Sequence, residues 1–407
     1  MTTTDVFLMV LRAALWKKPL DWKGRSLTHG QYQSLMTLAR EQAVTGLVGQ
    51  ALIDSGARLE RQDALELFAT IQGIRKLNAR MDEAVVALCL EMETAGIRIF
   101  VFKGQTIAPY YPDAGLRQCG DIDFYCFPED WERAIEWFRE NWQVEPYGLN
   151  TEKDVAFTYD GIAYEMHRML TLFMYPAHSR YWEQTVMGEI RGAETGLNQV
   201  GVNGYEIPTL GVTYNVLYVF VHIFQHLISD GIGVRQFCDW ARIINENENV
   251  NENDNENDNE NYSNDRSARS DASHLKDENG GVTMDVQLLQ KHLEGIGLRK
   301  AFTGLGAILT DYLGLPEEAF PFEITPDDHQ KAPALFENMI EMGNFGHNKQ
   351  YKESRGVRHA MQHLGRISLQ ARRFYHYAPA EAWWRIPYMF KWWMKKVGMM
   401  MKEGRGN

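Results

Sequence analysis

Apolar residues recur at helical spacing along the first part of the chain. Residues 35–47 and 84–92 place apolar side chains three and four positions apart, the period that gathers them on one face of an α-helix. Gly96 is expected to end the second of these helices, because glycine takes up the left-handed conformation of a C-cap at little cost. Residues 1–95 are therefore predicted to form an N-terminal helical region.

The pattern changes after residue 96. Residues 97–102 are rich in β-branched and aromatic side chains and are predicted to form a strand, as are residues 121–127. Two further apolar runs flank Asp160-Gly161, a dipeptide typical of the tight turn in a β-hairpin. We therefore predict a small mixed sheet within residues 96–205.

Helical spacing returns near residue 209, with Leu217 and Phe224 on one face. It is interrupted by residues 245–281, which open with asparagine alternating with glutamate or aspartate. This segment is too polar to offset its chain entropy by burial, so a disordered insertion is expected. Residues 206–407 are predicted to form a C-terminal helical region around it. The predicted fold class is α+β, a small mixed sheet flanked by helical N- and C-terminal regions.

Chain length and net charge indicate how many packed units to expect and which partners are disfavoured. A chain of 407 residues exceeds one comfortable hydrophobic core, so about two or three packed units are expected. Of the net charge of −12, residues 245–281 supply −8 through eleven acids and three bases. The rest of the chain is close to neutral, which disfavours long nucleic acid as a partner.

The cysteines and the apolar runs bear on the compartment. The four cysteines form no CxxC pair, a usage typical of reduced thiols in a cytosolic protein. The first residues lack the basic and apolar stretches of a signal peptide. No run of about 18 apolar residues predicts a membrane-spanning helix. The expected compartment is the cytoplasm.

The second expected strand carries two carboxylates two positions apart. In Asp121-Ile122-Asp123 both aspartates point to one face of the strand, while Ile122 and Phe124 are expected to enter the core. Like charges so close together repel unless a cation lies between them. Hard divalent ions such as Mg²⁺ take oxygen ligands, and two such ions side by side assist phosphoryl transfer. The alternative is a solvated strand end with two surface acids.

Three further features favour the metal site. Lys103-Gly104 closes the preceding strand, where glycine lets a phosphate approach the backbone and the ammonium neutralises it. Arg117 lies four residues before Asp121, in place to clamp a phosphate or orient an aspartate. Glu165 lies in an apolar strand, where a buried acid is costly without a cation or base. The predicted metal ligands are Asp121, Asp123 and Glu165.

At these positions the chain resembles the DNA polymerase β-like nucleotidyltransferase superfamily, in particular its bacterial family of nucleotidyltransferase family proteins. The shared pattern is F-K-G, then R-x-x-G-D-I-D, then a later Glu-x-His. Here it consists of Phe102-Lys103-Gly104, Arg117–Asp123 and Glu165-Met166-His167. The chain departs from the wider superfamily at the turn, where Gly104-Gln105 replaces Gly-Gly or Gly-Ser.

The resemblance implies catalytic and metal-binding roles for Asp121 and Asp123, with Glu165 as a third ligand or as the base for an acceptor hydroxyl. It also implies that Gly104 contacts the triphosphate. The expected nucleotide-binding residues are Lys103, Gly104, Gln105 and Arg117. The expected reaction transfers a nucleoside monophosphate from a nucleoside triphosphate, with two Mg²⁺ ions, to a small molecule, a sugar phosphate or a protein.

Two other functions remain open. A binding or regulatory protein that kept the fold without catalysis is favoured by Gln105 at the turn. Metal-dependent hydrolysis of a phosphate ester would use the same carboxylates with water as the acceptor.

Two pairs of residues have helical spacing on the later helices. His222 and His226 stand four apart, as zinc ligands do, but Ile223 occupies the position at which a metalloprotease has its glutamate. We interpret these histidines as core or site-lining residues. Arg235 and Asp239 are expected to form a local ion pair.

Two C-terminal segments are basic. Residues 349–373 hold seven lysines or arginines against one acid, with Arg355, His359, His363 and Arg366 on one helical face. This face is either a solvated surface or a site that attracts anions. Residues 388–401 mix tryptophan and methionine with lysine, and are expected to pack on another helix or, as the weaker alternative, to lie on a membrane surface.

Overall fold

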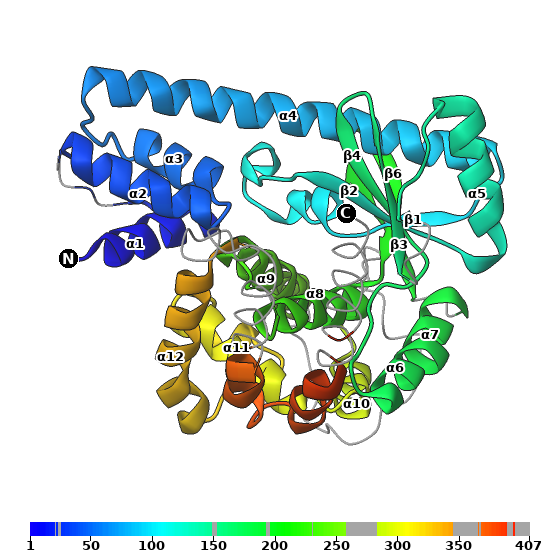
Figure 1. Cartoon of the computed structure of the whole chain (residues 1–407). Coiled ribbons are helices and arrows are strands. Elements are labelled where there is room, and N and C mark those ends of the chain that lie inside the picture. The colour runs from blue at the N-terminus through cyan, green and yellow to red at the C-terminus, as the bar shows by residue number, and fades with distance from the viewer. Residues whose placement is uncertain are drawn as a thin grey trace, which may run out of the picture.

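A computed structural model describes residues 1–20, 22, 26–148, 153–192, 196–229, 231–257, 283–344, 365, 368–388 and 394, with the backbone alone over 246–257. It confirms the α+β class, because a small mixed sheet lies among many helices (Figure 1). The N-terminal helices are α1 (Thr3–Leu15), α2 (His29–Glu41), α3 (Thr45–Asp54) and α4 (Arg61–Thr94). The strands are β1 (Ile99–Val101), β2 (Asp121–Cys126), β3 (Asp154–Tyr159), β4 (Ile162–His167), β5 (Leu197–Val202) and β6 (Tyr205–Leu210).

The remaining helices follow the strands or lie between them. Three short ones are α5 (Trp131–Trp137), α6 (Pro176–Tyr181) and α7 (Met187–Gly192). The longer ones are α8 (Val212–Leu227), α9 (Val234–Asn257), α10 (Val286–Gly295), α11 (Arg299–Asp311) and α12 (Pro326–Met342). In the part of the chain that the structure describes, no helix combines the length and the apolar content needed to cross a bilayer.

Local sequence sets the ends of several helices. Thr2 with Asp5, and Thr28 with Gln31, form capping boxes that satisfy the free backbone N–H groups of α1 and α2. Helix α4 ends where the sequence predicted, because Gly96 follows it with φ of +65°.

The four-stranded sheet has the order β1-β2-β4-β3. Strand β2 runs parallel to β4, and the other neighbours are antiparallel. The predicted hairpin is confirmed: Asp160 and Gly161 turn it with φ of 47° and 70°, the left-handed values of a tight hairpin turn.

The two faces of this sheet enter two hydrophobic cores. Ile122 and Phe124 point into the first core, as predicted, together with the C-terminal half of α4 and with α5. Phe102 and Tyr125 on the opposite face enter the second core with α8 and α9. That second core also contains α1 to α3 and α10 to α12, so the N- and C-terminal helical regions are packed together (Figure 1). Helix α4 contributes side chains to both cores.

Strands β5 and β6 form a hairpin that the sequence analysis missed. The expected boundary between residues 205 and 206 falls inside β6. Asn203-Gly204, with φ of 51° and 79°, was the available signal for this turn. Pro208 within β6 obscured it, because proline is depleted in strands.

Several expectations lie at the edge of the described chain. Helix α9 continues to Asn257, into the segment expected to be disordered from residue 245; an existing helix extends more easily than a new one starts. Residues 258–282 lie outside the described residues, as does the basic face of Arg355, His359, His363 and Arg366. Of residues 388–401, only Tyr388 and Met394 are described.

Candidate active site

The turn after β1 holds the backbone of Lys103 in a conformation that favours glycine. Its φ of 61° and ψ of −156° fall in a region that costs a residue with a side chain on the order of 1–3 kcal/mol. Gly104 follows with φ of +46°, and a Cβ atom built there would lie 3.1 Å from Sγ of Cys119. The chain thus keeps a lysine where backbone strain opposes it, which points to a use for its ammonium group.

Strands β2 and β4 bring carboxylates to one place. Their parallel pairing sets Asp123 beside Glu165 and Tyr125 beside His167. Nζ of Lys103 lies 3.3 Å from Oδ1 of Asp123, and Nε2 of His167 lies 3.0 Å from the same oxygen. Nε2 of His167 also lies 3.5 Å from Oε2 of Glu165. Lys103, Asp123, Glu165 and His167 therefore form one cluster at the sheet.

Burial and charge act on these groups in opposite directions. Burial alone would lower the pKa of Lys103, but Asp123 and Tyr218 outweigh it and keep this pKa above its ordinary value. Burial alone would raise the pKa of Asp123, but Lys103 and His167 outweigh it and hold this pKa below its ordinary value. The pKa of Glu165 is lowered, chiefly by its hydrogen bond with His167. Both carboxylates are therefore ionised at neutral pH.

Asp121 is the least satisfied carboxylate of the site. Burial, followed by the charge of Asp123, raises the pKa of Asp121 to about 6. Lys103 and Arg235 offset only part of this rise. Ionised Asp121 is therefore costly where it is buried beside Asp123, and a divalent cation would relieve this cost.

The donor atoms fit a metal ion. One ligand atom each of Asp123, Glu165 and His167 lies within 4.8 Å of the others. Asp121 lies outside this group, although it lines the same cavity as Asp123. Carboxylate oxygens suit Mg²⁺ or Mn²⁺, whereas imidazole suits transition metals, so the carboxylates are the donors that fit Mg²⁺.

His167 was not assigned a role from the sequence. Its signal was the Glu-x-His spacing, which puts both side chains on one face of a strand. That spacing shows the shared face of Glu165 and His167, but not that Asp123 of another strand meets them there.

Arg117 is paired with Asp239 of α9 rather than with an aspartate of β2. Its Nε and Nη2 each lie 2.8 Å from a carboxylate oxygen of Asp239, which also accepts a hydrogen bond from the hydroxyl of Tyr111 at 2.6 Å. The side chains of this ion pair are 2% and 4% exposed. Asp239 is thus engaged by Arg117 and not by Arg235 as expected, and Arg235 donates to the backbone carbonyl of Gln118.

Two guanidinium nitrogens face no acceptor. Nη1 of Arg117 and Nε of Arg235 are buried without a hydrogen-bond partner among the residues described. Both arginines line a cavity together with Lys103. Leaving a buried donor unpaired costs roughly 1–3 kcal/mol, and more for charged groups, so this wall is suited to an anion.

Gln105 points away from the carboxylates. Its side chain is buried and its Nε2 donates to Oδ1 of Asp82 on α4. Gln105 is absent from the lining of the cavity, whereas Gly104 contributes to it. Of the expected nucleotide-binding residues, the structure therefore brings Lys103, Gly104 and Arg117 to the cavity and leaves Gln105 outside it.

The cavity between the carboxylates and α8 is small, about 30 Å³. That volume accommodates a group of water size, so a whole nucleotide enters only if lining side chains move. The lining comprises Lys103, Gly104, Ile107, Arg117, Cys119, Asp121, Asp123, Val219, His222, Arg235, Gln236 and Asp239.

The two histidines of α8 lie beside this cavity. The ring centroids of His222 and His226 are 4.4 Å apart, and His222 lines the cavity. Burial, with the charge of Lys103 next, lowers the pKa of His222 well below its ordinary value and that of His226 to about 3. Both rings are therefore neutral at physiological pH, and His222 is a site-lining residue.

The mixed sheet thus carries Asp121 and Asp123 on β2, with Glu165 of β4 beside Asp123. The chain belongs to the family of uncharacterised nucleotidyltransferases, whose sequence profile matches residues 28–267, and this confirms the expected family. The match covers more than half of the chain and includes every candidate site residue.

One solved structure similar to the chain is that of an antigenic nucleotidyltransferase-like protein from Paracoccidioides brasiliensis. The two are 11% identical with a TM-score of 0.30, over 40% of this chain and 74% of that one. A search of curated proteins gives no match.

Proposed function

We propose that this protein is a divalent-metal-dependent nucleotidyltransferase, which transfers a nucleoside monophosphate from a nucleoside triphosphate to an acceptor. An oxygen of the acceptor hydroxyl or phosphate attacks the α-phosphorus, the bond to the β-phosphate oxygen breaks, and pyrophosphate leaves. The observation that carries the proposal is the excess of carboxylates on β2 and β4 beside a lysine held in a strained backbone.

Each side chain of the site has a role in this proposal. Asp121, Asp123 and Glu165 would hold up to two Mg²⁺ ions, which would supply positive charge to the phosphates when bound. Lys103, which pairs with Asp123 at 3.3 Å, exchanges that partner for a phosphate oxygen when metal takes its place. If Asp121 and Asp123 alone held the metal, Glu165, half-exposed at 42%, would instead accept a proton from an arriving hydroxyl.

The opposite wall receives the phosphates. Nη1 of Arg117 and Nε of Arg235, which have no hydrogen-bond partner among the described residues, donate to non-bridging phosphate oxygens. The backbone of Gly104, free of a side chain, lets the phosphates approach the turn. The acceptor class remains that of a small molecule, a sugar phosphate or a protein.

The test measures transfer of the ³²P label from each of the four α-³²P-labelled ribonucleoside triphosphates to a second molecule. Purified protein is incubated with each nucleotide, Mg²⁺ or Mn²⁺, and a cell extract as the source of acceptor. We expect label on a second molecule with wild type, and its loss with Asp123→Asn. Asp160→Asn, the same change at the exposed tip of the β3–β4 hairpin, is the matched control and keeps the activity.

Two results would contradict transfer. Release of labelled monophosphate alone indicates hydrolysis, with water as the acceptor. Calorimetry with no metal-dependent nucleotide affinity, and no difference between wild type and Asp123→Asn, indicates a protein that kept the fold without catalysis.

A further inference from the structure

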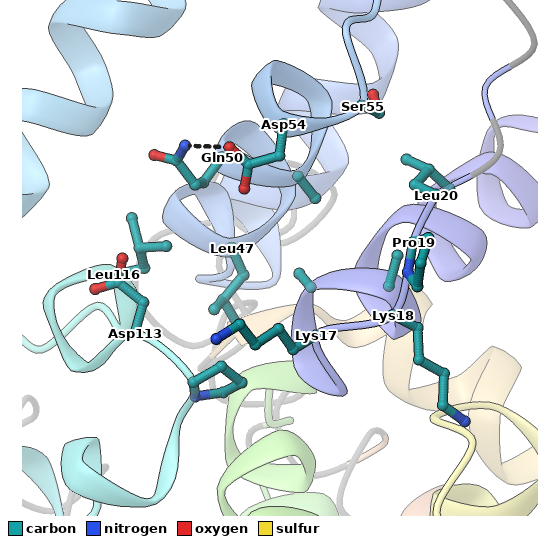
Figure 2. A pocket seen from close by; sticks show the side chains of 14 residues that line it. Lys17, Lys18, Pro19, Leu20, Leu47, Gln50, Asp54, Ser55, Asp113 and Leu116 are labelled. Atoms are coloured by element: carbon teal, nitrogen blue, oxygen red, sulfur yellow. Dashed lines mark hydrogen bonds between the residues drawn. The ribbon is translucent and has the colours of Figure 1, made fainter.

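A cavity of about 600 Å³ lies outside the candidate active site, in the N-terminal helical region (Figure 2). Helices α1 and α3 form two of its walls, and the segment before Arg117 forms a third. None of its lining residues lines the cavity beside the carboxylates. Its volume lies within the range of sites that bind small molecules.

The walls of this cavity combine apolar and polar side chains. Leu47 and Ala51 of α3, Leu20 after α1, and Pro112 and Leu116 of the third wall supply apolar surface. An apolar body of a ligand is therefore buried on entry, which favours binding.

Lys17 reaches into the cavity from a strained position. It follows α1 with φ of 50°, and the hydrogen bond from N of Lys18 to the carbonyl of Ala13 closes the end of the helix. The same position holds glycine after α3 and α4, at Gly56 and Gly96, and alanine after α2, at Ala43 with φ of 56°; the left-handed conformation disfavours a side chain there. A lysine here gives up backbone stability and gains an ammonium group at the cavity.

Among the described residues, the charged side chains that line the cavity form no ion pairs with one another. Figure 2 shows the side chain of Lys17 directed toward Leu47 and Asp113, while Lys18 points away. Asp113 is already paired with Arg75 at 2.6 Å. Within the described residues Lys17 forms no ion pair, and Asp54 accepts only a neutral hydrogen bond from Gln50 at 2.8 Å. Lys17 and Asp54 are thus exposed side chains at the cavity, and neither has a charged partner among the described residues.

We propose that this cavity binds a small zwitterion with an apolar body, the chemistry of a hydrophobic α-amino acid. Its carboxylate pairs with Lys17, its ammonium pairs with Asp54, and its side chain lies on Leu47 and Leu116. A ligand that carries both charges forms an ion pair with each of Lys17 and Asp54, whereas a ligand with one charge forms only one of the two charged contacts. The binding needs neither metal nor nucleotide and does not rest on the proposed transfer reaction.

Calorimetry or NMR titration of the full chain tests this with three probes that share a phenyl ring. L-phenylalanine carries both charges, 3-phenylpropionate only the negative one, and phenethylamine only the positive one. We expect L-phenylalanine to bind at millimolar or lower concentration, and each of the other probes to bind about ten-fold more weakly or worse.

Three variants locate the site. Lys17→Gly and Asp54→Asn are each expected to weaken L-phenylalanine about ten-fold or more. Lys18→Gln, at a neighbouring lining residue whose side chain points away (Figure 2), keeps the affinity. Lys17→Gly is also expected to raise the melting temperature, because glycine relieves the backbone, so its loss of binding is not a loss of folding.

Binding of the three probes and the variants can contradict the proposal in three ways. The proposal is overturned if L-phenylalanine fails to bind at about 10 mM, if Lys17→Gly or Asp54→Asn binds it as tightly as wild type, or if the three probes bind equally.

Discussion

Two neighbouring groups of charged side chains in this molecule differ in how completely their charges are paired. In the first, Arg117 and Asp239 form a bidentate ion pair that is almost fully buried and that Tyr111 completes. In the second, Asp121 lies buried beside Asp123 with its pKa raised to about 6, and Lys103 occupies a strained backbone. The first group is balanced without a ligand and the second is not.

This difference separates a structural role from a functional one. A buried pair with matched charges fixes the segment before β2 against α9 and gains nothing from a ligand at its paired atoms. An unbalanced group of carboxylates costs stability until a cation arrives, so its persistence points to binding. Arg117 belongs to both, because it lines the cavity and its Nη1 is buried without a hydrogen-bond partner among the residues described.

The largest expected change in stability comes from breaking the ion pair of Arg117 and Asp239. Asp239→Asn leaves the guanidinium of Arg117 buried without its counter-charge, and should lower the free energy of unfolding by about 3–5 kcal/mol. Urea denaturation measures it. The double variant Arg117→Met with Asp239→Leu should recover most of the loss, because apolar residues of similar volume remove both charges. A loss below about 1 kcal/mol for Asp239→Asn would show that the pair is not structural.

Removing a charge from the group of Asp121, Asp123 and Glu165 is expected to raise the free energy of unfolding rather than lower it. The folded-state pKa of Asp121 is raised from 3.8 to about 6, so its ionisation destabilises the metal-free protein above pH 6, and this cost disappears below pH 4. Asp121→Asn should therefore stabilise the metal-free protein at pH 8 by on the order of 2 kcal/mol.

The same substitution should give little stabilisation at pH 4, and saturating Mg²⁺ should reverse its effect at pH 8. Thermal unfolding with EDTA and with Mg²⁺ measures both. A stabilisation that does not depend on pH would argue against the charge as its cause.

A smaller effect concerns the strain at Lys103. Lys103→Gly and Lys103→Ala both remove the ammonium, but only glycine suits φ of 61° and ψ of −156°. Lys103→Gly should be more stable than Lys103→Ala by at least about 1 kcal/mol, and both should lose nucleotide affinity. Denaturation and calorimetry compare them; equal stability of the two variants would mean that the backbone carries no strain.

The smallest effect is expected at Gln105. Because its side chain bonds to Asp82 and not to the cavity, Gln105→Ala should cost about 1 kcal/mol of stability and leave nucleotide affinity unchanged. Calorimetry with ATP and Mg²⁺ tests it. A clear loss of affinity in a folded variant would return Gln105 to the nucleotide site.

Local features of this chain could be predicted from its sequence. The alternation of side chains along the strand predicted that Ile122 and Phe124 enter the core, Asp160-Gly161 predicted the hairpin turn, and Gly96 predicted the end of α4. Each of these features depends on residues only a few positions away in the sequence. The same logic placed the two aspartates of β2 beside one cavity.

Features that depend on distant residues could not be predicted. The partner of Arg117 is 122 positions away, so nothing local distinguishes a structural arginine from one that binds phosphate. Gln105 turns toward α4 for the same kind of reason, since Asp82 precedes it by 23 positions. His167 meets Asp123 only because β2 pairs in parallel with β4, a register that the sequence does not specify.

The shared core of the N- and C-terminal helices has a consequence for synthesis on the ribosome. Nε of Arg12 in α1 donates to the carbonyl of Tyr312, 300 positions later, and α1 to α3 bury their apolar faces in the core that α8 to α12 complete. At about 5–20 residues per second, the nascent N-terminal helices wait roughly 15–60 s for these partners. During that time their apolar faces are exposed, which favours aggregation until the later helices have been synthesised.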